Sequence, residues 1–91
     1  METKVLNYRV IVEKEPFKKG FIYVAYAPTL GLSDFGKNIE EAVKNLEKEI
    51  KLYLEVLVKL KKPIPTPDGE EYFVTARKIE VLVPAKNLAY F

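Results

Sequence analysis

The side chains that most often carry out catalysis at neutral pH are missing from this sequence. It has no histidine and no cysteine, which removes imidazole acid–base catalysis, thiolate nucleophiles and the commonest transition-metal ligands. Carboxylates remain, because clusters of them hold paired metal ions in nucleases. However, Asp34 and Asp68 are both expected in turns, and Glu13 and Glu80 stand alone on strands. We therefore predict that the protein is not an enzyme and has no catalytic residues, metal or cofactor.

One segment resembles a phosphate-binding loop. Gly31 to Lys37 follows the spacing G-x-x-x-x-G-K, and a predicted helix comes next. The motif also requires a Ser or Thr hydroxyl on Mg²⁺, where this chain has Asn38, and a parallel α/β sheet larger than this chain can build. We therefore interpret Gly36 as a turn residue and Asn38 as a helix cap.

A second segment resembles the aromatic strand of RNA-binding domains. Lys19 to Tyr26 follows the pattern K/R-G-F/Y-G/A-F/Y-V-x-F/Y except at Ile22. Phe21 and Tyr23 project from the same face, where bases stack in that fold. A helix precedes this strand in RNA-binding domains, whereas here only one strand does. Two interpretations stay open: a face that binds RNA or a partner, or an aromatic face buried in the core or against another subunit.

Length and composition predict one globular domain that spans residues 1–91. The chain is 48% hydrophobic and 31% charged, as in soluble folded proteins. A net charge of +2 is too balanced to indicate nucleic acid or membrane binding. No signal-peptide pattern is visible in the sequence, and it contains no long apolar run, so we predict a cytoplasmic protein. The excess of Lys and Glu without Gln or Cys favours a thermophilic source.

Hydrophobic periodicity predicts three strands in the first 36 residues. Val5–Lys14 alternates with period two, and Phe21–Ala27 is apolar on both faces, as in a central strand. Lys14–Gly20 is charged and contains Pro16, so we expect a turn there. Leu32–Phe35 is expected to form a short third strand.

A long amphipathic helix is expected next. Asn38 and Glu41 have the spacing of a capping box, with Asn as the N-cap. Apolar residues then recur at intervals of three and four to form one stripe. The helix is expected to end near Lys61, because the prolines that begin at Pro63 cannot continue it.

The remainder predicts a closing strand and an apolar tail. Asp68-Gly69 indicates a turn, and Tyr72–Val83 indicates one bent strand or two short ones. Residues 85–91 form a tail that is more apolar than a solvent-exposed tail normally is. The resulting fold class is α+β, with order β-β-β-α-β and one long helix packed on a small, mainly antiparallel sheet. Exposed strand edges and apolar ends favour association, so we expect a dimer or tetramer. Aromatic residues favour interface centres, and two interpretations of Tyr72, Phe73, Tyr90 and Phe91 stay open: they lie in the interface, or they cap the protein's own small core.

Five ordered motifs, from about residue 6 to residue 84, resemble the HicB-like antitoxin family. They are an opening hairpin, a Pro-x-Leu-Pro-Gly-Cys turn, a capped helix with Glu-Glu-Ala, a proline-rich loop after the helix, and a closing strand. The corresponding segments are Tyr8–Glu13 with Gly20–Val24, Pro28–Leu32 followed by Gly36, Ile39–Ala42, Ile64–Pro67 and Lys78–Pro84. Leu52–Glu55 is also similar to the end of the family's helix. Leu30 replaces a proline of the family motif, and Leu32 replaces its cysteine.

The resemblance implies a partial ribonuclease H-like fold that lacks catalytic activity and forms oligomers. It also implies a partner, a small HicA-type toxin that cleaves messenger RNA and is neutralised when its active site is covered. Many family members carry a DNA-binding domain after the position of Pro84, and none follows here, so we expect no DNA binding by this chain alone. Two alternatives stay open: an orphan homo-oligomer without a toxin, and an RNA-binding module that uses Phe21 and Tyr23.

Overall fold

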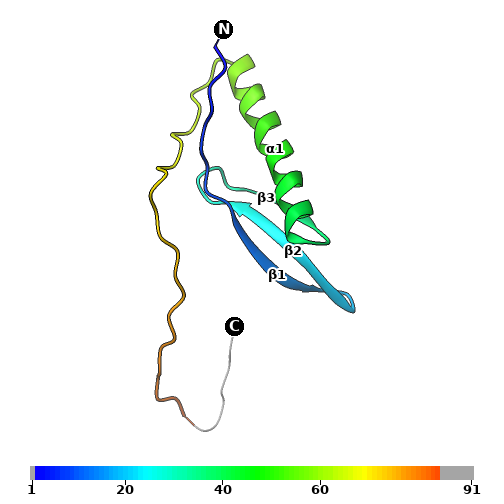
Figure 1. The fold of residues 1–91 in the computed structure, drawn as a ribbon, viewed down its shortest axis with the longest axis vertical. Helices are drawn as coiled ribbons and strands as arrows, with labels where there is room; N and C mark the ends of the chain where they lie inside the picture. The colour runs from blue at the N-terminus through cyan, green and yellow to red at the C-terminus, as the bar shows by residue number, and fades with distance from the viewer. Residues whose placement is uncertain (1, 85–91) are drawn as a thin grey trace.

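A three-stranded antiparallel sheet and one helix form the body of the protein. The computed structural model describes residues 2–84 and contains β1 (Ile11–Phe17), β2 (Gly20–Ala27), β3 (Leu32–Gly36) and α1 (Ile39–Lys59). The strands lie in the order β1-β2-β3, and α1 packs mainly against β3 and β2 (Figure 1). This arrangement confirms the α+β class and the predicted order of three strands followed by a helix.

The first strand begins later than its alternating pattern predicts. β1 starts at Ile11, and the segment 14–17, expected as a turn, continues the strand and pairs with β2 as far as Phe17 opposite Gly20. The prediction of a turn from Lys14 was therefore wrong. Pro16 is tolerated because β1 is an edge strand, where the missing N–H need not join a ladder. The actual turn is only Lys18-Lys19, with Lys18 at a positive φ of 56°.

The helix follows its local signals closely. The Asn38 side chain accepts a hydrogen bond of 2.8 Å from the backbone N–H of Glu41, which confirms the predicted cap. The last helical residue is Lys59, two residues before the expected end, and Lys61 takes a positive φ of 56° before the proline-rich loop. Within residues 2–84, no helix has the length and apolarity needed to cross a membrane.

The core is small and lies on one side of the sheet. Its fully buried residues are Ala25 and Ala27 of β2 and Ala42 and Leu46 of α1. The alanines allow the helix to approach the sheet closely, and Leu46 is the one large side chain among the described residues that is fully buried. Partly buried side chains surround this cluster: Val10, Val12, Tyr23, Leu30, Leu32, Val43 and Ile50.

No closing strand is formed within the described part of this chain. Residues 70–84, which we call the C-terminal arm, have no strand assignment and are all exposed. They run as an extended chain away from the sheet and the helix (Figure 1). The prediction of a paired strand over Tyr72–Val83 was therefore wrong for the described part of the single chain. The sequence pattern is that of a strand, but a strand also needs a neighbour that satisfies its backbone hydrogen bonds.

Candidate functional site

The face of the sheet opposite α1 is apolar and uncovered. Alternation along the strands places Val24, Tyr26 and Phe35 on this face, since Ala25 and Ala27 point toward the helix. Ile11 lies opposite Tyr26, and Ile22 lies two residues before Val24. Phe35 is 58% exposed and Tyr26 43%. A sheet face that met only water would be polar, so this open face has the character of an interaction surface.

Two glutamates border the open face along β1. Glu13 lies opposite Val24 and Glu15 opposite Ile22, so both project from the same side as Tyr26. Together with Ile11 and Ser33, they line a shallow hollow of about 260 Å³. Apolar side chains beside carboxylates suit a partner that presents apolar groups next to basic ones.

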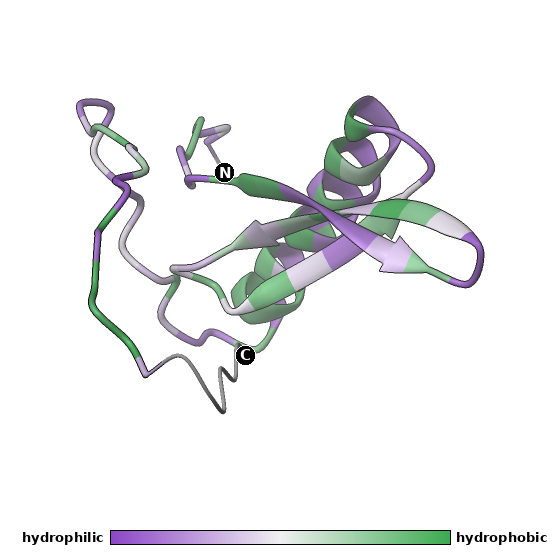
Figure 2. Ribbon diagram, turned by 90° about the horizontal axis from the view of Figure 1, so that it is seen from below, coloured by the Kyte–Doolittle hydropathy of each residue, from purple (hydrophilic) through white to green (hydrophobic). Residues whose placement is uncertain are grey.

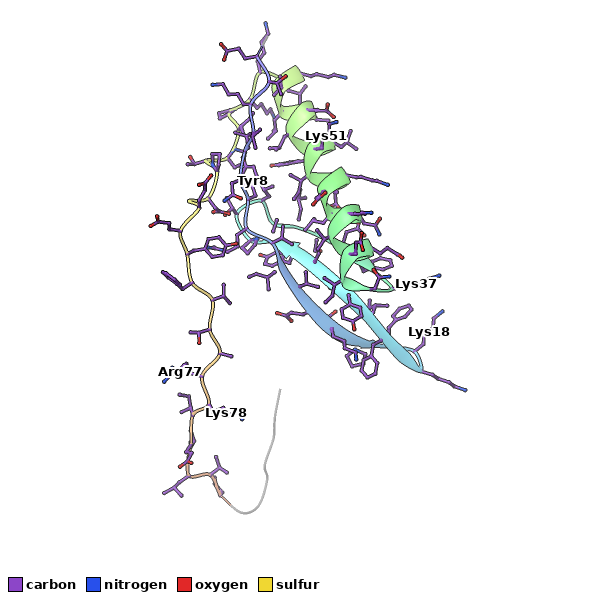
Figure 3. All side chains as sticks on the ribbon, viewed as in Figure 1. Tyr8, Lys18, Lys37, Lys51, Arg77 and Lys78 are labelled. Atoms are coloured by element: carbon purple, nitrogen blue, oxygen red, sulfur yellow. The ribbon has the colours of Figure 1, made fainter. Side chains whose placement is uncertain are left out.

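Asp68 fastens the loop after the helix to the start of the chain. Its backbone N–H donates to the carbonyl of Asn7 at 2.8 Å. Its carboxylate accepts from the Thr29 hydroxyl at 2.6 Å and from the Arg9 backbone N–H at 2.8 Å. Nearby, the Tyr8 hydroxyl, labelled in Figure 3, donates to the carbonyl of Pro65 at 2.6 Å. From the sequence, only the turn at Asp68-Gly69 could be predicted, because the hydrogen-bond partners of Asp68 lie far away along the chain.

These contacts shift two pKa values in opposite directions. The hydrogen bond from Thr29, the hydrogen bond from the Arg9 backbone and the positive charge of Arg9 lower the pKa of Asp68. Burial raises the pKa of Tyr8, and the negative charge of Asp68 raises it further. The carboxylate of Asp68 is therefore favoured in the folded chain.

We expect this carboxylate to make stability depend on pH under acidic conditions. Because its pKa is lower when folded, its stabilising effect is complete above the ordinary Asp pKa of 3.8 and disappears as the pH falls through the folded value. The free energy of unfolding, measured with urea, should therefore fall less in Asp68→Asn than in the wild type when the pH is lowered from 6 to 2.5. Equal pH slopes for the two proteins would contradict the assigned role.

A second pair of carboxylates lies on the helix side of the sheet. Burial raises the pKa of Glu49, and a hydrogen bond with Asp34 and the negative charge of Asp34 raise it further. Asp34 belongs to β3, as the strand expected over Leu32–Phe35 implies, and its assignment to a turn was wrong. No group of three potential metal ligands occurs in residues 2–84, so this pair carries no argument for a metal site.

The two aromatic residues of the RNA-like motif lie on the helix side. Tyr23 packs against the buried cluster, whereas Phe21 is 58% exposed and has the Lys14 ammonium 4.4 Å from its ring centre. Because α1 covers Tyr23, the two rings do not form a free stacking platform. The interpretation of this face as part of the core fits Tyr23 better than Phe21.

The predicted interface residues have different surroundings. Tyr72 lies at the base of the arm, where the Arg9 guanidinium is 5.2 Å from its ring centre. Phe73 is 98% exposed, and the structure gives it no covering group among the described residues. Tyr90 and Phe91 lie outside the described residues. Of the four residues, the structure therefore describes only Tyr72 and Phe73, and it places them in different surroundings.

A groove also runs along the C-terminal half of α1. It has a volume of about 760 Å³ and lies between the helix, the first residues of the chain and the proline-rich loop. Its apolar walls come from Leu6, Leu54, Val58, Ile64 and Pro67. Lys51, labelled in Figure 3, stands at its border.

Comparison with known proteins identifies the family. The chain is 38% identical over 66 residues to the UPF0150 protein ssr1765 of Synechocystis sp.. The match covers 71% of this chain and 80% of the relative. No family model and no solved structure matches the chain. The extent and identity of the match show that the chain belongs to the UPF0150 family.

Proposed function

We propose that this protein is a non-enzymatic HicB-like antitoxin module that binds and neutralises a small HicA-type toxin. Two independent features support the proposal. The five ordered motifs of that family extend over most of the chain, and the sheet carries an apolar face that its own helix leaves uncovered. The uncovered face is the observation on which the proposal mainly rests.

The chemistry of the open face suits a toxin that binds RNA. Such an enzyme attracts phosphates with basic side chains, and the overall charge of +2 on this chain gives no general attraction for it. Glu13 and Glu15, however, place two carboxylates beside the apolar centre formed by Val24, Tyr26 and Phe35. We expect the carboxylates to orient the toxin and the apolar centre to supply most of the affinity.

The alternatives receive less support. An RNA-binding module based on Phe21 and Tyr23 would need both rings free, and Tyr23 packs against the core. An orphan homo-oligomer remains the second candidate, and the exposed apolar arm favours it. The antitoxin and the orphan homo-oligomer differ in the role of the open face, because only the antitoxin uses this face to bind a toxin.

The proposal is tested with a toxin of this type encoded in the same genome. The purified toxin should cleave messenger RNA, and the wild-type protein should stop the cleavage when added in equal amount. Phe35→Ser should weaken binding of the toxin by about tenfold or more, since removal of a central aromatic residue costs an interface over 1.4 kcal/mol. Calorimetry and the cleavage assay measure the two effects.

Leu52→Ser is the matched control. Leu52 is 63% exposed on α1, close to the 58% of Phe35, but it belongs to the helix rather than to the open face. We expect this variant to bind and inhibit like the wild type. A toxin that neither binds the wild-type protein nor loses activity beside it would refute the antitoxin function. Equal losses in the two variants would refute the assignment to the open face.

A further inference from the structure

The C-terminal arm exposes more apolar surface than a folded chain normally leaves in water. Phe73 and Leu82 are fully exposed, and Val74, Ile79 and Val81 are each about 70% exposed or more. Figure 2 shows hydrophobic segments of the arm far from the helix and the sheet. Both alternating faces carry apolar residues, as in a strand that is covered on both sides.

The dimensions of the chain indicate the same deficit of burial. A folded monomer of 10.5 kDa has an accessible surface of about 5,400 Å², whereas this chain exposes 8540 Å². Its radius of gyration is 17.9 Å, against about 12 Å for a compact chain of this length. A standard interface buries about 800 Å² on each partner. The surplus is therefore larger than one stable dimer needs.

The base of the arm is held beside the segment that precedes β1, and not beside β1 itself. Just before the arm, the backbone N–H of Asp68 donates to the carbonyl of Asn7. Four residues later, the Tyr72 ring contacts the guanidinium of Arg9. The two segments thus run in the same direction. Beyond Tyr72, the arm and β1 diverge (Figures 1 and 3), so Arg77 and Lys78 extend away from the sheet of their own chain.

β1 offers a free edge to an incoming strand. It is a terminal strand of the sheet, with β2 as its one neighbour in the described chain, and it is seven residues long, whereas the other edge strand, β3, has five. An unpaired edge presents backbone donors and acceptors that another extended segment can satisfy. The arm has the length and the apolar residues of such a segment.

We propose that two copies of this chain exchange their arms, so that residues 72–83 of each copy add a strand to the β1 edge of the other. The exchange is reciprocal and therefore closes as a symmetric dimer. It satisfies the backbone groups of both the arm and β1, and it buries the apolar side chains of the arm between the two bodies. This interface does not depend on the proposed toxin.

Cross-linking between chains tests the exchange directly. The chain has no cysteine, so Glu13→Cys in β1 and Arg77→Cys in the arm each give a single reactive thiol. The two variants are unfolded together, refolded as a mixture and treated with a short bismaleimide. We expect a product of twice the chain mass that contains one copy of each variant. The double variant Glu13→Cys with Arg77→Cys is treated in the same way. An intramolecular product there, together with no mixed product from the two single variants, would show that the arm pairs with its own β1 and would overturn the proposal.

Proline in the arm provides the second measurement. Successive residues of a strand direct their N–H groups to opposite sides, so Ile79→Pro with Glu80→Pro removes donors on both sides. Light scattering should show about 21 kDa, twice the chain mass, for the wild type and the chain mass of 10.5 kDa for this variant. Ile79→Thr with Glu80→Thr keeps the donors and should remain dimeric. A wild-type monomer, or a dimer insensitive to the prolines, would overturn the exchange.

Discussion

Replacing Leu46 with alanine is expected to remove much of the stability of the fold. Leu46 is fully buried between α1 and the sheet, and the other core residues are alanines. Truncation of a buried leucine costs about 2–5 kcal/mol, through lost transfer free energy and the cavity that remains. Small domains have total stabilities near 5 kcal/mol or somewhat more, so the variant should be largely unfolded in mild denaturant.

Urea unfolding followed by circular dichroism measures this effect. All proteins are compared at one chain concentration, because association contributes to the apparent stability. Leu52→Ala is the matched control, since it makes the same chemical change at a helix position that is 63% exposed. We expect this control to change the free energy of unfolding by about 0.5 kcal/mol or less. Equal losses at the two positions would refute the placement of the core.

Gly36→Ala is expected to have the second large effect. A Cβ atom at Gly36 would lie 2.5 Å from the backbone nitrogen of Ala42 and 2.8 Å from the backbone carbonyl carbon of Glu41. Backbone atoms of the first helical turn cannot move away as a flexible side chain does. The last residue of β3 must therefore shift from α1, at a cost of about 1–3 kcal/mol or more.

The requirement at Gly36 is one of space, because its φ is not positive. Gly20→Ala is the control, since a Cβ there meets nothing within 4 Å. Thermal unfolding should show a clearly lower midpoint for Gly36→Ala and little change for Gly20→Ala. Equal midpoints for the two variants would show that α1 does not approach β3 as closely as the structure indicates.

Elements with local signals could be predicted from the sequence. Asn38 and Glu41 cap the helix through atoms three residues apart, and Pro63 prevents its continuation. The second and third strands also follow from short apolar runs bounded by turn residues. The bounds predicted for the first strand were wrong because its second half has the charged composition of a loop. An edge strand nevertheless tolerates Glu, Lys and Pro.

Sequence alone therefore determined the order of the three strands and the helix, the approximate bounds of the helix, and the absence of His and Cys chemistry. Tertiary structure alone decided which face of the sheet α1 covers, since alternation makes Phe21 and Tyr23 share a face without saying which one. It also decided the role of Asp68, whose partner Asn7 lies 61 residues away. The arm has a strand pattern but no pairing strand among residues 2–84. A sequence pattern alone does not make a β-strand, because the backbone groups of the strand need a neighbouring strand as hydrogen-bond partner.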